Sequence, residues 1–173
     1  MFIIEAMFKN SLTRQIAEFL TRIGLEIIPR RLDENTFLDG IFIENGKIFV
    51  DESKLAFPGD LLHEAGHLAV TPKNLRARLS DEITLPDEFN IDAIEVAAIA
   101  WSYAAALHLG LDPRLVFHES GYKGRSESLL LGFSFGVYIG VNTLEEAGMT
   151  AASENARRLG AEAYPQMLKW LRD

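Results

Sequence analysis

Apolar residues recur at helical spacing between residues 10 and 24, where they would share one face of a helix: Ile16, Phe19, Leu20 and Ile23. Asn10 or Ser11 can cap the start of this helix, and Gly24 can end it. The mostly apolar run over residues 25–28 is typical of a short strand. The chain is therefore expected to open with a helix and then a strand.

Residues 40–51, GIFIENGKIFVD, carry the firmest local pattern in the chain. Buried-type apolar residues alternate on both sides of an Asn-Gly pair, at Ile41, Ile43, Ile48 and Val50. Asn45 and Gly46 readily adopt the positive φ angles that a two-residue hairpin turn requires. The pattern therefore predicts a β-hairpin.

Two further apolar segments predict helices that pack in the interior. The first runs from about residue 60 to 70, after Pro58-Gly59, and stops before Pro72. A charged loop is expected over residues 73–86. A long helix then runs from Asp87 to about residue 109, with acidic residues at its positive end.

The rest of the chain, from Pro113 onward, is expected to be mostly helical, over residues 113–119, 126–136, 144–146 and 151–171. No internal repeat or linker stands out, so residues 1–173 are interpreted as a single domain. The expected fold class is α+β, a small sheet with a hairpin packed on helices and followed by a helical C-terminal tail.

Composition narrows the class of protein. With 48% hydrophobic and 24% charged residues, the chain resembles a compact soluble protein rather than a disordered one. Its formal net charge of −8 provides no general basic footprint, so we expect neither nucleic acid nor a membrane as a partner of the chain by itself. The oligomeric state is left open.

The chain has no cysteine, which excludes disulfides, cysteine-ligated zinc and thiol catalysis. The first residues, MFIIEAMFKN, do not form a signal peptide pattern, because Glu5 interrupts the apolar run and no basic region precedes it. A cytoplasmic location is therefore expected.

The candidate chemistry is concentrated in His63-Glu64-Ala65-Gly66-His67, an HExxH sequence. Residues four apart lie on one face of a helix, so both imidazoles can bind one Zn²⁺ while Glu64 acts as the general base and acid. About 0.01 such matches are expected by chance in a chain of this composition. The alternative is a pair of surface histidines and an ordinary glutamate on an amphipathic helix.

A catalytic zinc site needs a third protein ligand, and Glu95 is the strongest candidate. It lies in IDAIEVAAIAWSYAAAL, where nearly every neighbour is apolar, so a carboxylate there requires a positive partner. The alternative partner is an arginine such as Arg76 or Arg78. Asp92, one turn earlier, could accept a hydrogen bond from a ligating histidine, although a helix N-terminal charge is the preferred interpretation.

Residues 118–125, HESGYKGR, form a polar loop that could provide a donor to an oxyanion beside the metal. His118 and Tyr122 are the candidates for this oxyanion or substrate contact. The alternative, which we prefer at this point, is an ordinary surface loop.

The HEAGH helix, together with a glutamate in the later pattern E-V-A-A-I-A-W-S, resembles the glutamate-ligand branch of the zincin metallopeptidases. Within that branch the chain is most similar to the compact ImmA/IrrE-type metallopeptidase domains, over residues 40–106. The resemblance implies a zincin-like fold, with the hairpin packed on the HExxH helix and the third ligand on a second helix. It departs from those domains in having no obvious DNA-binding region.

The expected function is a Zn²⁺-dependent metallopeptidase that acts on a peptide or protein substrate, which the hairpin would hold by strand addition. The alternative is a regulatory or binding protein that keeps the zinc site without proteolysis, because metal binding can stabilise a fold.

Overall fold

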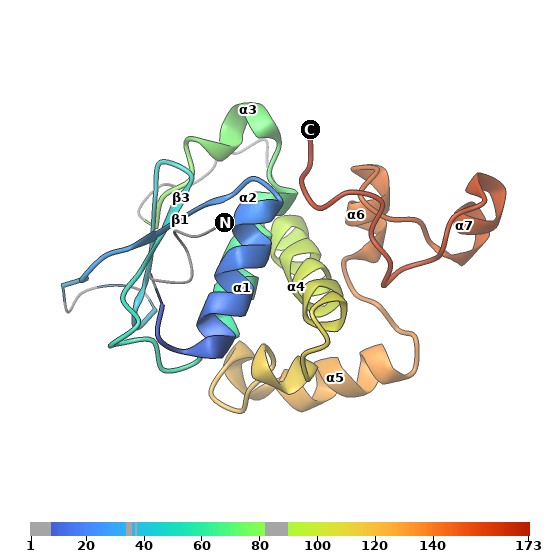
Figure 1. The fold of residues 1–173 in the computed structure, drawn as a ribbon. Coiled ribbons are helices and arrows are strands. Elements are labelled where there is room, and N and C mark those ends of the chain that lie inside the picture. Colours follow the sequence, from blue (N-terminus) through green and yellow to red (C-terminus); the bar gives the residue numbers. More distant parts are fainter. Residues whose placement is uncertain (1–7, 34–35, 37, 82–89) are drawn as a thin grey trace.

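The structure is a computed structural model that describes residues 8–33, 36, 38–81 and 90–173 (Figure 1). Within these residues the fold is α+β, as expected, with a three-stranded mixed sheet and seven α-helices. The strands are β1 (Glu26–Pro29), β2 (Ile41–Glu44) and β3 (Lys47–Val50). The helices are α1 (Ser11–Arg22), α2 (Asp60–Val70), α3 (Lys73–Arg76), α4 (Ile91–His108), α5 (Ser126–Ser134), α6 (Val141–Glu146) and α7 (Ser153–Leu159). No helix in the described ranges has the length and apolarity needed to cross a membrane.

Helix α1 forms where its apolar spacing predicts it. The side chain of Asn10 caps its first turn by accepting from the backbone N–H groups of Leu12 and Thr13. Gly24 follows the helix with a φ of +104°. The buried face of α1 packs against β1 and α2, which fixes the helix over the sheet (Figure 1).

The predicted hairpin is confirmed as β2 and β3, an antiparallel pair joined by Asn45 and Gly46, whose φ angles are 52° and 72°. Its alternating apolar residues are buried against the helices. Strand β1 pairs with β3 in parallel, which gives the sheet the order β1-β3-β2. Strand β2 is therefore an edge strand of the sheet.

Helices α2 and α4 lie side by side and form the centre of the molecule (Figure 1). Gly66 makes their close approach possible, because a Cβ at that position would lie 3.0 Å from the carbonyl oxygen of Ala98. This agrees with the interpretation that a mid-helix glycine admits a neighbouring element. One turn before Ala98 is Glu95, so the contact brings Glu95 opposite the HExxH residues.

Helix α4 begins later in the described residues than the predicted start at Asp87. The helix begins at Ile91, and the side chain of Asn90 caps it by accepting from the N–H of Ala93. Asp87 and Glu88, which were expected to open the helix, lie outside the described residues, as does the end of the predicted loop over residues 73–86. The first residues of that loop form the single turn α3. Asp92 is exposed in the first turn of α4, where a negative charge favours the helix N-terminus.

The expectation of a largely helical C-terminal part is confirmed for residues 126–136 and 144–146, where α5 and α6 form, and is wrong for most of the remainder. Of residues 151–171 only Ser153–Leu159 form a helix, which ends at the left-handed Gly160, and residues 113–119 contain only the 3₁₀ turn η2 (Pro113–Leu115). The tail beyond α7 runs back along the core as turns and bends without regular secondary structure. Its backbone pairs with residues 149–151, through an isolated bridge between Thr150 and Met167.

Tertiary contacts explain why the tail is not helical. The ring of Trp170 lies 5.0 Å from that of Phe19 and 5.6 Å from that of Trp101, and its carbonyl accepts from the Trp101 indole N–H. The backbone N–H of Arg172 donates to the carbonyl of Ala69 in α2. These contacts place the aromatic ring between α1 and α4, and they outweigh the helical preference of the local sequence.

Candidate metal centre

The two histidines of the motif face the same point, as their spacing on α2 predicts. Their Nε2 atoms are 3.1 Å apart, and the side chains are 15% and 25% exposed. Burial lowers the pKa of His63 to about 3, helped by the nearby charge of His67, and burial lowers the pKa of His67 to about 4. Neutral imidazoles keep a free lone pair, so both rings can bind a metal at neutral pH.

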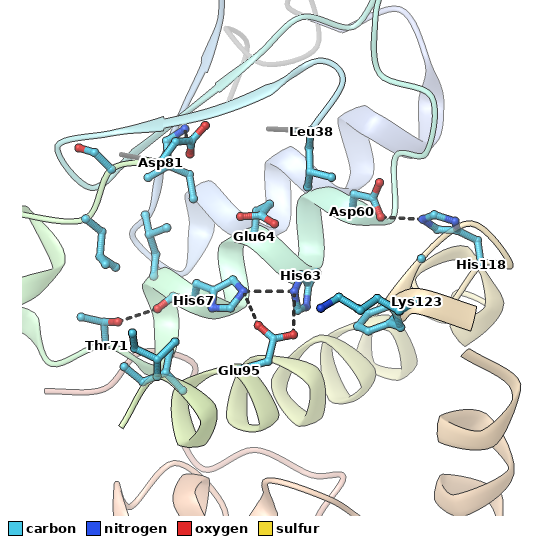
Figure 2. A pocket seen from close by; sticks show the side chains of 18 of the residues that line it. Leu38, Asp60, His63, Glu64, His67, Thr71, Asp81, Glu95, His118 and Lys123 are labelled. Carbon is cyan, nitrogen blue, oxygen red and sulfur yellow. Dashed lines mark hydrogen bonds and ion pairs between the residues drawn. The ribbon is translucent and has the colours of Figure 1, made fainter. Parts of the chain in front are cut away.

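Glu95 reaches the two imidazoles from α4. One carboxylate oxygen lies 3.6 Å from Nε2 of His63 and the other lies 3.3 Å from Nε2 of His67 (Figure 2). Ligand atoms at tetrahedral positions around one zinc, with bonds of about 2.0–2.1 Å, are separated by about 3.3–3.4 Å. The two imidazole nitrogens and the Glu95 carboxylate lie at separations of this order, with a different carboxylate oxygen facing each histidine.

The surroundings of Glu95 differ from the fully apolar environment expected for it. Its side chain is 44% exposed, because it points into a cavity between α2 and α4 rather than into the apolar core. The alternative partner Arg76 donates instead to backbone carbonyls of Leu68, Thr71 and Arg172. In the described part of the chain, the close side-chain contacts of the Glu95 carboxylate are with Nε2 of these two neutral imidazoles.

Glu64 lies beside this group. His63, Glu64 and His67 each have one nitrogen or oxygen atom that lies within 4.8 Å of the corresponding atoms of the other two. Burial raises the pKa of Glu64 to about 8, and the charges of Asp81, Asp60 and Glu95 add to this effect. A carboxyl with this pKa is suited to take up and release a proton near neutral pH.

These groups line one cavity of about 730 Å³, which is bounded by α2, the start of α4, the hairpin and the loop after η2. Its polar or charged lining residues are Asp60, His63, Glu64, His67, Thr71, Ser80, Asp81, Glu95, His118, Ser120, Tyr122 and Lys123. Leu38, Ile43, Ile91 and Ile94 are among the apolar residues of its wall. The cavity is large enough for a segment of a substrate and is strongly acidic.

His118 and Tyr122 both line this cavity, but neither presents a free donor beside the histidine pair. Nε2 of His118 is 2.8 Å from Oδ1 of Asp60, and its ring stacks on Phe57 with a centroid distance of 3.8 Å. The Tyr122 hydroxyl is buried beside the Ser102 side chain, and burial raises its pKa. The tyrosine ring instead contacts His63 edge to face.

Three features of the site were not found from the sequence. Asp60, one turn before Glu64, pairs with His118, and Lys123 lies at the rim of the cavity. An acid at the start of a helix and a lysine in a loop have no sequence signal that separates them from ordinary surface charges. The third feature is the segment over residues 79–81, which lies along β2.

Residues 79–81 cover the hairpin edge that was expected to hold a substrate. The N–H of Ile43 donates to Oδ1 of Asp81, and the N–H of Asp81 donates to the carbonyl of Ile43. The N–H of Asn45 donates to the Ser80 hydroxyl. The N–H of Gly46 donates to the carbonyl of Leu79. Strand addition at these positions would therefore have to displace a segment of the chain itself.

Comparisons with known proteins give no family for the chain: no protein-family model, no curated protein and no solved structure matches it.

Proposed function

We propose that the protein is a zinc-dependent metallopeptidase with a zincin-like fold. His63, His67 and Glu95 would hold the metal, and Glu64 would act as the general base and then the general acid. The observation that carries this proposal is the convergence of two neutral imidazoles and one carboxylate, at mutual distances of 3.1–3.6 Å, from two helices that Gly66 allows to approach.

The donor set fits zinc better than other common metals. Two imidazole nitrogens and one carboxylate leave a fourth tetrahedral position for water or substrate, as catalytic zinc sites do. Calcium and magnesium prefer sites built from oxygen atoms, and thiolate ligands are absent because the chain has no cysteine. The hairpin, the HExxH helix and the helix that carries Glu95 follow one another along the chain, which is the order that the resemblance to the zincins implies.

Bound zinc would polarise the substrate carbonyl and make a water molecule more acidic. Glu64 takes a proton from that water as the water oxygen bonds to the carbonyl carbon. Glu64 then gives the proton to the amide nitrogen as the C–N bond breaks. The products are a carboxylate and an amine, with no other reactant consumed.

A second candidate function is a regulatory or binding protein that keeps the zinc site for stability. The segment over residues 79–81 favours this reading, because it occupies the edge of β2 on the wall of the cavity. Glu64 argues against it, since a purely structural zinc site has no need of a buried carboxyl beside the ligands.

The test combines metal content with hydrolysis. Purified protein is expected to contain about one equivalent of zinc by elemental analysis, the content of a mononuclear catalytic site. Zinc-loaded protein should cleave members of a quenched fluorescent peptide library, and chelation should abolish that cleavage. Glu64→Gln should keep the zinc and lose turnover. Protein that takes up no zinc would contradict the proposal, and zinc-loaded protein without turnover would favour the binding function.

A further inference from the structure

A single cationic side chain faces the acidic cavity. Lys123 is the only lysine or arginine among the described lining residues, which include the carboxylates of Asp60, Glu64, Asp81 and Glu95. Figure 2 shows its side chain extending from the loop toward His63 and Glu95. Burial raises the pKa of Glu95, and the charge of Lys123 opposes that rise.

The ammonium group of Lys123 has no close protein partner. It is exposed, and in the part of the chain that the structure describes it makes no hydrogen bond or ion pair. The carboxylate of Glu95 lies close to the two neutral imidazoles, and the charge of Lys123 acts on it from a longer distance. When a dication occupies the histidine pair, the two positive charges repel each other unless an anionic atom lies between them.

The backbone that carries Lys123 is held in an unusual conformation. The 3₁₀ turn η3 (Tyr122–Gly124) has three successive positive φ angles, 53° at Tyr122, 54° at Lys123 and 76° at Gly124. Residues with a side chain rarely adopt this region, and such strain persists where the surrounding structure enforces it, often at functional sites. The backbone at Lys123 is thus determined by its neighbours.

Those neighbours connect η3 directly to the HExxH helix. The ring of Tyr122 packs edge to face on His63, with 5.2 Å between centroids, and lies 5.0 Å from the ring of Phe117. The Ser126 hydroxyl donates to the carbonyl of His118 at 2.7 Å, which closes the base of the loop. The position of Lys123 is therefore coupled to the position of His63.

Two other side-chain donors that line the cavity, His118 and Tyr122, are hydrogen-bonded or buried. Nε2 of His118 bonds to Asp60, and the Tyr122 hydroxyl lies beneath the cavity surface. Lys123 is exposed at the cavity, its side chain extends toward His63 and Glu95 (Figure 2), and its ammonium group carries three N–H donors. Charge that develops on a substrate oxygen is most strongly stabilised by a donor already in position.

We propose that Lys123 is a catalytic residue whose ammonium group donates a hydrogen bond to the oxygen of the reacting carbonyl. This inference rests on the proposed peptidase function. When the water oxygen bonds to the carbonyl carbon, one electron pair of the C=O bond moves to the carbonyl oxygen, which becomes anionic. The pair returns when the C–N bond breaks, with the proton on Glu64 passing to the leaving nitrogen.

The test uses zinc-loaded protein and two small probes that report binding without turnover. Phenylphosphonate carries tetrahedral anionic oxygens like those of the reacting centre, and imidazole is a neutral ligand for zinc. Dissociation constants for both are measured by calorimetry on wild type, Lys123→Met, Lys123→Arg and the control Lys73→Met. The control removes the same charge from an exposed residue outside the cavity.

Lys123→Met should weaken phenylphosphonate binding by about tenfold or more, the usual effect of losing a charge-assisted hydrogen bond. Imidazole binding should be unchanged, Lys123→Arg should keep most of the phosphonate affinity, and Lys73→Met should bind both probes as wild type does. Equal phosphonate affinity in wild type and zinc-loaded Lys123→Met would overturn this inference and leave the peptidase proposal intact. A wild-type protein that binds no zinc would overturn both.

Turnover provides a second readout. With peptides amidated at the C-terminus, Lys123→Met should lower kcat while KM changes little, because the hydrogen bond strengthens as the oxygen becomes charged. A loss confined to peptides with a free terminal carboxylate would show that Lys123 binds that carboxylate instead, and would refute the role at the reacting carbonyl.

Discussion

Asp51 and Glu64 are two carboxyl groups of the interior whose pKa values are shifted in opposite directions by their surroundings. Asp51 is 6% exposed and accepts from the N–H groups of Leu32 and Ser53 and from the Ser53 hydroxyl. Those hydrogen bonds, led by the Ser53 hydroxyl, lower its pKa. Glu64 lies among other acids, and burial raises its pKa to about 8. The chain provides hydrogen-bond donors for Asp51, whereas the acids around Glu64 raise its pKa further.

The comparison separates a carboxylate that stabilises the fold from one for which we propose a role in catalysis. Asp51 follows β3, and its hydrogen bonds hold residues 32 and 53 together at the end of the sheet. The acids around the histidine pair do not stabilise the fold in this way, because several negative charges line one cavity and repel one another. A site that is electrostatically unfavourable when empty gains more from binding a dication.

The largest expected effect is on metal affinity. Glu95→Ala should lower zinc affinity by more than the roughly 10–100-fold typical of removing a hydrogen-bond partner of a ligand. Asp51→Asn should leave zinc affinity unchanged, although it too removes an interior carboxylate. Competition with a chromophoric chelator measures both values. Equal zinc affinity in wild type and Glu95→Ala would remove Glu95 from the ligand set.

In the metal-free protein, substitution of Asp51 should cost more stability than substitution of the cavity carboxyl Glu64. Asp51→Asn should lower the free energy of unfolding by about 1–3 kcal/mol, because the side chain loses charge-assisted hydrogen bonds and presents an amide to two N–H donors. Glu64→Gln should leave this free energy unchanged or raise it at pH 8. Urea unfolding in the presence of a chelator measures both. A larger loss for Glu64→Gln than for Asp51→Asn would contradict the comparison.

The pH dependence of metal-free protein sharpens the same contrast. The pKa of Glu64 is raised on folding from 4.5 to about 8, so between these values the native state holds a proton that the unfolded state has lost. This carboxyl therefore lowers stability as pH rises from about 4.5 to 8. The stability difference, Glu64→Gln minus wild type, should grow over that interval. A difference that does not vary with pH would show that the pKa of Glu64 is not raised.

The smallest effect is expected at Asp92, an exposed acid in the first turn of α4. Asp92→Ala should reduce stability by about 0.3–1 kcal/mol through loss of a favourable charge at the helix N-terminus, and the loss should shrink at high salt. Zinc affinity should change by less than in Glu95→Ala. A change in zinc affinity as large as that in Glu95→Ala would place Asp92 in the metal site.

The elements with strong local signals could be predicted from the sequence. The Asn45-Gly46 turn fixes the hairpin, and the span from Asp60 to Val70 is bounded by Gly59 and Pro72, so these elements needed no tertiary information. The convergence of Glu95 on the histidines followed from residue chemistry, although the reason given for it, complete burial, was too strong.

Features that depend on distant contacts could not be predicted in this way. The tail around Trp170 has helical spacing in its sequence, but its irregular path follows from packing on Phe19 and Trp101. The position of Lys123 depends on a backbone conformation enforced by Tyr122 and its contacts, which the loop sequence does not reveal. The covering of β2 by residues 79–81 likewise depends on a pairing between segments more than 30 residues apart.

That covering of β2 has a kinetic consequence for any substrate that binds as an added strand. The segment over residues 79–81 is tethered to the same molecule, and a tethered competitor acts at an effective concentration on the order of millimolar. A short peptide would have to displace this segment each time it binds. A partner that is also bound elsewhere on the surface would itself act at a raised effective concentration. Cleavage would then favour substrates recruited at two points, and selectivity would be set by docking as well as by the residues around the cleaved bond.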